Sequence, residues 1–318
     1  NIEEFGRLPV LEGGRVKPLD TFARNSLLMI RSKQSVRAAG RPLTATRWLL
    51  DTALKPEASA AYPAFVVDDP EVLGVLGLEQ GKGRYFSYAQ LLSKRGEVNA
   101  QAQAADAVSL GERSRFQESV LALERRLNLY ERIQNTFMHS GHGDPVAELA
   151  VFRALMAEAM AALKGGKPSK KAAAMMGDLD ARLQSYGRLA EASAFKMLPP
   201  RSGEDETAWA GFAESLIRPG AGEDMHPGAA FVARMASAYR AGDAAAFNAA
   251  VAEQAAWNRA NAPTAVRQAR VEALFNRAQP FMSGITLYVI ALLLIFISWA
   301  VRREDLAASA QACAWAAF

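Results

Sequence analysis

Cysteine is almost absent from this chain of 318 residues, in which Cys313 is the single thiol. One cysteine excludes an intramolecular disulfide, and it excludes the cysteine clusters that hold zinc or iron–sulfur centres. Histidine is nearly as rare, with three residues, and aromatic side chains make up only 8% of the chain. Because alanine is abundant and aromatic residues are few, the composition favours helices over a β-sandwich. We therefore predict a mainly α fold.

The distribution of charge and the absence of known catalytic motifs exclude further classes of protein. The 37 basic and 33 acidic residues are interspersed, and no long basic block alternates with aromatic residues. This pattern argues against a nucleic-acid partner. The chain also lacks the G-x-S-x-G, P-loop, H-E-x-x-H and dinucleotide-binding motifs. We therefore predict no catalytic residue and no metal site, and whether the chain is part of an enzyme stays open.

Charge is missing altogether from Phe281 to Val301, a run of 21 residues near the C-terminus. About 20 apolar residues in a helix span the hydrocarbon layer of a bilayer, so we predict a transmembrane helix over 280–302. Trp299 lies where an indole ring can occupy the headgroup region. Arg302 and Arg303 follow directly, and the positive-inside tendency then directs the preceding chain to the outer side of the membrane.

The residues after the two arginines, 303–318, again lose all charge after an acidic first turn. We interpret them as the start of a second, truncated membrane helix; the alternative is an amphipathic tail on the membrane surface. The chain begins with Asn1 rather than methionine, so we expect that an upstream signal or anchor could precede it. The predicted organisation is a helical domain over 1–279, followed by the membrane helix and the truncated one.

The segment 13–24, "GGRVKPLDTFAR", predicts a hairpin that leads into a helix. Gly14 permits the turn, Pro18 ends the extended segment, and Asp20 or Thr21 can cap a helix that runs to about residue 33. We also expect Arg15 or Lys17 to pair with Asp20.

Further helices follow from apolar periodicity and capping residues, and one isolated strand is predicted at 64–68. The predicted helices cover 44–54, 69–75, the segment after Ser87, 111–138, 148–163, one or two helices after 169, 207–217, 228–240, 243–258 and a last one from 264.

His139 and His142 form the one close histidine pair, and the glycines around them indicate a loop. As haem or metal ligands they would need further partners, for which Asp144 and His226 are the candidates in the sequence. The alternative, which we favour, is a solvated loop. The methionines at helical spacing are better explained by core packing.

Several segments together resemble the extracytoplasmic region of the System II, CcsA-like cytochrome c biogenesis proteins. The resemblance begins with Leu8-Pro9-Val10 and the motif Gly14-Arg15-x-Lys17-Pro18-Leu19-Asp20-Thr21. It continues in order through "RWLLDTAL", "PAFVVDDPEVLGVLGL", "YFSYAQL", "RLNLYERIQNTF", "MLPP" and "LFNRAQPF", which runs into "LYVIALLL". These pieces cover nearly all of residues 8–301.

The resemblance implies a periplasmic domain on the bacterial inner (cytoplasmic) membrane, joined to a membrane core that handles haem and attaches it to apocytochrome c. It implies haem as cofactor, and apocytochrome c, a thiol-reducing protein and membrane lipid as partners. The tryptophan-rich loop and the membrane histidines on which the family's chemistry depends are not visible in this sequence. No catalytic residue is therefore carried over.

Two interpretations of the 13–24 motif remain, one structural and one functional. In the first, Gly14, Arg15, Pro18, Asp20 and Thr21 fix the N-terminal segment on the domain. In the second, Arg15, with Lys17 and Arg24, forms a basic surface for haem propionates or an acidic partner.

A second function class, a membrane-anchored scaffold subunit of a respiratory or photosynthetic assembly, fits the visible chemistry equally well.

Overall fold

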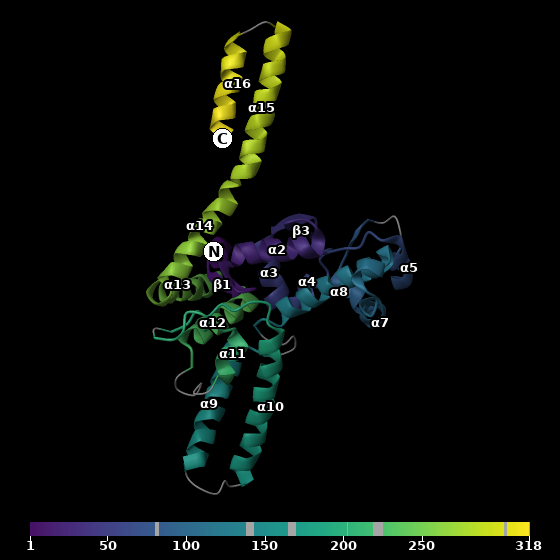
Figure 1. Cartoon of the computed structure of the whole chain (residues 1–318). Helices are drawn as coiled ribbons and strands as arrows, with labels where there is room; N and C mark the ends of the chain where they lie inside the picture. Colours follow the sequence, from purple (N-terminus) through teal and green to yellow (C-terminus); the bar gives the residue numbers. More distant parts are fainter. Residues whose placement is uncertain are drawn as a thin grey trace. The chain divides into compact units, whose positions relative to one another are not determined.

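A computed structural model describes residues 1–79, 83–137, 143–164, 170–201, 203–218, 225–301 and 304–317. The prediction of a mainly helical protein with small β-hairpins is confirmed (Figure 1). The chain divides into two compact units, Asn1–Ala269 and Arg270–Phe318. The division therefore falls within a helix, and the second unit starts ten residues before the predicted membrane helix at 280.

The first unit begins with four short elements around the 13–24 motif. Helix α1 (Ile2–Gly6) precedes the antiparallel pair β1 (Pro9–Glu12) and β2 (Arg15–Pro18), and α2 (Leu19–Arg31) follows without a linker. Gly13 and Gly14 connect the strands with φ angles of 59° and 75°. Positive φ at both central residues is the geometry of a type I′ turn, which explains the pair of glycines.

The expected cap of α2 is wrong. The helix starts at Leu19 with Pro18 at the N-cap position, and no side chain caps it. Asp20 and Thr21 lie one and two residues inside the helix, because the strand ends directly in the helix and leaves no room for a capping turn. Asp20 also does not pair with Arg15 or Lys17; it accepts a hydrogen bond from Thr46 (2.8 Å) and pairs with Arg24 (2.6 Å).

The middle of the first unit consists mainly of helices, joined by two further hairpins. The elements are β3 (Ser35–Ala38), β4 (Arg41–Thr44), α3 (Ala45–Leu54), α4 (Pro56–Ser59), β5 (Phe65–Val66), α5 (Pro70–Leu76), β6 (Tyr85–Phe86), α6 (Tyr88–Leu92), α7 (Arg95–Asp106), η1 (Leu110–Glu112) and α8 (Arg115–Gln134). Ser87 and Ser114 each form a capping box, and Asp69 caps α5.

Three differences from the predicted elements stand out here. The β3–β4 hairpin was not expected from the sequence, and the predicted strand at 64–68 contracts to the two residues of β5, which pair with β6. The predicted helix at 111–138 begins four residues later, since the capping box of Ser114 sets its start.

The remaining helices of the first unit are α9 (Pro145–Lys164), α10 (Lys170–Ala192), α11 (Phe212–Ile217), α12 (Pro227–Ala241), α13 (Ala244–Asn261) and the first part of α14 (Pro263–Ala278). Helices α9 and α10 form a long antiparallel arm (Figure 1). After α10 the chain returns to the N-terminal hairpin, where Leu11 and Lys196 exchange two backbone hydrogen bonds of 2.8 and 2.9 Å. Leu198 and Ala210 form a second such bridge.

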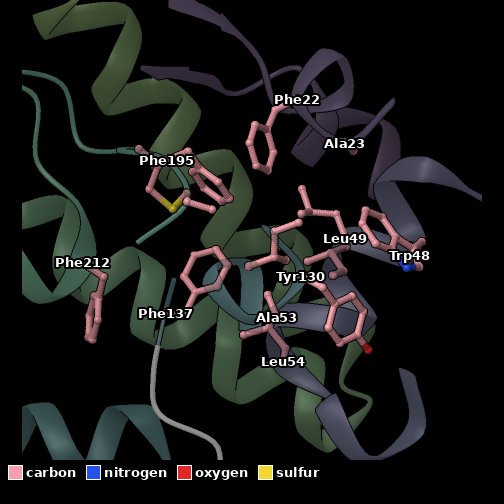
Figure 2. Packing of buried hydrophobic residues seen from close by; sticks show 14 of the residues in the cluster. Phe22, Ala23, Trp48, Leu49, Ala53, Leu54, Tyr130, Phe137, Phe195 and Phe212 are labelled. Carbon is pink, nitrogen blue, oxygen red and sulfur yellow. The ribbon is translucent and has the colours of Figure 1, made fainter. Parts of the chain in front are cut away.

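Aromatic side chains from distant parts of the chain meet in the core of the first unit (Figure 2). The ring of Phe195 lies 4.8 Å from that of Phe22 and 5.9 Å from that of Phe137. Trp48, which is completely buried, packs 6.4 Å from Tyr130. Ring pairs at these separations contribute beyond their buried area, so the core fixes α2, α3 and α8 against the 195–198 segment.

The second unit contains the end of α14, then α15 (Pro280–Val301) and α16 (Glu304–Ala317), which pack against each other. Gln279, with a φ of 44°, separates α14 from α15. Most apolar side chains of α15 are exposed, among them Phe281 and Trp299. Among the described residues one helical segment, Pro263–Val301, is long and apolar enough to cross a membrane. This segment is one candidate C-terminal membrane span.

Candidate functional site

The residues of the 13–24 motif are held by local contacts. Arg15 is exposed on β2, directly after the hairpin turn. Lys17 pairs with Glu12 at 2.5 Å, across the hairpin, and Arg24 pairs with Asp20. Lys17 and Arg24 therefore already have carboxylate partners, and Arg15 has an interaction of its own; its proposed binding role stays a prediction.

The candidate histidine ligands divide into two groups. His139 and His142 lie outside the described residues. His226, which is 3% exposed, has a structural position: its Nε2 lies 2.9 Å from the carbonyl oxygen of Pro199, and its Nδ1 accepts a hydrogen bond from the Gly228 backbone. With both nitrogens engaged, the neutral ring donates through Nε2 and accepts through Nδ1. Burial lowers the pKa of His226, which favours this neutral form.

Asp144, the other proposed partner ligand, caps α9. Its carboxylate accepts from the backbone of Val146 and Ala147, and from the hydroxyl of Ser237. The hydrogen bond from Ser237, ahead of the backbone ones, lowers the pKa of Asp144. The described residues contain no group of His, Cys, Asp and Glu arranged to hold a metal ion.

A cavity of about 290 Å³ opens where α1, α3, α12 and α13 meet in the first unit. Its lining combines cationic, aromatic and small apolar side chains: Asn1, Ile2, Arg47, Lys55, Ala238, Tyr239, Gly242, Asp243, Ala244 and Phe247. Gly242, with a φ of 77°, ends α12 in the left-handed conformation that favours glycine. The sharp turn brings Tyr239 and Phe247 together, with 5.5 Å between the ring centres.

Asp51 organises the α3 side of this cavity. It lies one helical turn after Arg47 on the same face of α3, and Lys55 directly follows the end of the helix. Asp51 is 4% exposed, and its carboxylate accepts hydrogen bonds from Tyr239 (2.6 Å) and Tyr62 (3.0 Å). Arg47 approaches the same carboxylate at 3.4 Å. Three donors thus satisfy a buried charge that would otherwise be costly.

Burial and the nearby carboxylate of Asp51 keep the phenol groups of Tyr62 and Tyr239 protonated. Burial, followed by the charge of Asp51, raises the pKa of Tyr62 to about 12. Burial and the hydrogen bond to Asp51 also raise the pKa of Tyr239. Both groups are therefore hydrogen-bond donors rather than acids or bases near neutral pH.

Two cations flank the Tyr239 ring. The Arg47 guanidinium carbon lies 5.2 Å and the Lys55 ammonium 5.1 Å from the ring centre, both within range of a cation–π interaction. Lys55 has no ion pair among the residues that the structure describes. Asp243, the carboxylate in the lining, is engaged as the N-cap of α13. The cavity therefore places two cations beside an aromatic wall.

This arrangement is suited to binding an anionic group. The lining contains no histidine, serine or cysteine that would act as a base or nucleophile. Arg47 presents a planar fork of donors and Lys55 a point charge, both of which match carboxylates and phosphates. We conclude that the cavity can hold a small anionic group against an aromatic ring.

None of the cavity residues was predicted from the sequence. Arg47 and Asp51 lie within the predicted helix at 44–54 and Lys55 directly follows it, but Tyr239 is distant in sequence and its place requires the fold. The chain matches no model of a known protein family, and it matches no curated protein.

Proposed function

We propose that this chain is the extracytoplasmic part and first membrane span of a System II cytochrome c biogenesis protein. The observation that carries the proposal is the order of the sequence pieces, from the 13–24 motif to "LFNRAQPF", which ends where the apolar helix α15 begins. A helical unit that precedes one candidate span supports it. In this proposal the large unit lies on the periplasmic side of the bacterial inner membrane, with Arg302 and Arg303 on the cytoplasmic side.

Haem is the group that such proteins handle, and the described residues do not fit it as an axially ligated cofactor. Both ring nitrogens of His226 are engaged, and His139 and His142 lie outside the described residues. The cavity beside Tyr239 has the size for a small group or a single acidic arm rather than a whole macrocycle. We therefore assign no haem ligand here and propose that the unit docks apocytochrome c or its thiol reductant and supports the membrane core.

Production of the complete protein in a bacterial host that lacks its own cytochrome c assembly proteins tests this function. An apocytochrome with a Cys-x-x-Cys-His site is produced with it, and covalent haem is measured by the peroxidase activity of the denatured cytochrome in a gel. We expect haem attachment that depends on the complete protein, and haem absorption in the purified membrane protein.

The alternative is a membrane-anchored scaffold subunit of a respiratory or photosynthetic complex. The absence of a catalytic group from the cavity lining is compatible with it. No covalent haem on the apocytochrome, together with no haem in the purified protein, would contradict the biogenesis proposal and leave the scaffold.

A further inference from the structure

A cluster of cations surrounds Tyr85 on β6, in the same unit as the cavity but built from other residues. The guanidinium carbon of Arg31 lies 3.8 Å from the centre of the Tyr85 ring, the Lys33 ammonium lies 5.5 Å away, and the Arg84 guanidinium carbon lies 5.7 Å away. Three cations around one ring exceed what a single cation–π contact needs. We call Met29, Arg31, Lys33, Arg37, Arg84, Tyr85, Arg125 and Arg126 together the Tyr85 face.

Two of these arginines build the floor of the Tyr85 face. Arg31, which is 8% exposed, donates from Nε to the carbonyl oxygen of Pro63 at 3.1 Å. Arg126 donates to the carbonyl oxygens of Met29 (3.2 Å) and Val66 (2.8 Å). These bonds fix the end of α2 to β5 and α8. Because the acceptors are neutral carbonyls, the contacts position both guanidinium groups without cancelling their charge.

Further cations lie close to this floor. Burial is the main cause that lowers the pKa of Arg31, and the nearby charge of Arg37 lowers it further. The pKa of Arg126 is lowered in the same way, first by burial and then by Arg125 and Arg84. Arg37 and Arg125 are themselves exposed.

One carboxylate offsets this charge in part. Asp68 accepts from Arg84 at 2.6 Å, in an exposed pair, and it also favours the charged form of Arg126. Among the residues that the structure describes, we find no ion pair to Arg31, Lys33, Arg37, Arg125 or Arg126. The face therefore gathers six cations against one paired carboxylate, and such mutual repulsion costs stability unless an anionic partner relieves it.

We propose that the Tyr85 face docks a protein partner that presents a carboxylate-rich segment. Five of its six cations are arginines, whose planar forks bind carboxylates in pairs of hydrogen bonds. Tyr85 and the exposed Met29 add two residue types that, with arginine, are enriched at protein interfaces. An anionic lipid surface needs only point charges, so the arginine, tyrosine and methionine composition favours a protein. The inference does not depend on the cavity or on a role in cytochrome c biogenesis.

Binding of a fluorescein-labelled hexaglutamate peptide to the full chain in nanodiscs of neutral lipid tests the proposal by fluorescence polarisation. We expect saturable binding that is lost at about 1 M salt, where the Debye length is only about 3 Å. The double variant Lys33→Glu and Arg84→Glu should weaken binding roughly tenfold or more, because it removes two attractions and adds two repulsions.

A matched control reverses two exposed arginines on the α9–α10 arm, Arg153→Glu and Arg188→Glu, for the same change in net charge. Both double variants are first compared with the parent by circular dichroism, and the peptide result is interpreted only for folded protein. Binding retained by the control and lost in the Lys33 and Arg84 variant supports the proposal. Absence of peptide binding, or equal loss in both variants, overturns it.

Amide hydrogen exchange separates a protein partner from a lipid surface. Residues 31–37 and 84–86 should be protected by the peptide in neutral nanodiscs. Protection of these amides by phosphatidylglycerol in the nanodiscs, without protection by the peptide, would assign the Tyr85 face to lipid and overturn the protein partner.

Discussion

Replacement of Tyr239 by phenylalanine tests the hydrogen-bond network beneath the cavity. The change removes one hydroxyl and leaves the ring, so its packing against Phe247 and the two cations persists. The lost bond is short, at 2.6 Å, and its acceptor is the buried carboxylate of Asp51. A hydrogen bond to a charged group contributes about 1.5–3 kcal/mol, and we expect Tyr239→Phe to lower the free energy of unfolding by about 2 kcal/mol.

Tyr62→Phe removes the weaker hydrogen bond to Asp51 and is compared with Tyr239→Phe. Its hydroxyl reaches the same carboxylate at 3.0 Å from a more exposed position, so we expect a loss of about 1 kcal/mol. Urea titrations of the full chain in mild detergent, followed by tryptophan fluorescence, measure both losses, since Trp48 and Trp209 are buried in the first unit. The slope of the titration should not change, because neither variant alters the surface exposed on unfolding.

A double-mutant cycle assigns the effect to the pair of residues. In an Asp51→Asn background the bond from Tyr239 is neutral, so the cost of Tyr239→Phe should fall to about 1 kcal/mol or less. The reasoning is refuted if Tyr239→Phe costs less than Tyr62→Phe, or if its cost is the same with Asp51 and with asparagine at that position.

Three further perturbations follow from the described contacts. Burial lowers the folded-state pKa of His226 below its ordinary 6.5, so the unfolded chain binds the proton more readily. The free energy of unfolding should therefore fall as pH decreases below about 6.5. His226→Asn, which keeps a cap for α12, should flatten this dependence in urea titrations at several pH values. The pKa of Tyr62 is raised from 10.0 to about 12, so its contribution is present below pH 10 and should be lost between pH 10 and 12, a loss absent from Tyr62→Phe. Gly228→Ala would place a Cβ 2.6 Å from the buried Leu198, and we expect it to lower the free energy of unfolding by about 1–3 kcal/mol. Gly177→Ala, which has open space around the new Cβ, should cause no loss of stability. Thermal unfolding measures both variants.

The local elements of this protein were largely predictable because their signals lie within a few residues. Ser87 and Asp69 cap helices as expected, and the glycine pair at 13–14 gives the expected turn. The prediction of a side-chain cap for α2 failed because two local signals coincide. Pro18 is both the last residue of β2 and the N-cap position of α2. The β3–β4 hairpin was missed because Ala39 occupies a positive-φ position where the turn rule anticipates asparagine or glycine.

The sites were not predictable, for a different physical reason. Arg47 and Lys55 stand at regular helical spacing, but such spacing is equally typical of a solvated helix face. What makes them a site is Tyr239, which α12 brings between them. Likewise, Lys33 and Tyr85 become part of one surface only because the fold places β6 beside the end of α2. Contacts between distant segments decide both sites, and one sequence does not carry that information locally.

The bridge between Leu11 and Lys196 also has a consequence for the synthesis of the chain. The two backbone bonds join the first hairpin to a segment about 185 residues later. A polypeptide that emerges N-terminus first cannot close this contact until residue 196 has been made. Until then the outer edge of β1 offers unpaired backbone groups to any other strand. The nascent protein therefore has a long interval in which a chaperone that covers strand edges would protect it, and the interval ends when residue 196 arrives.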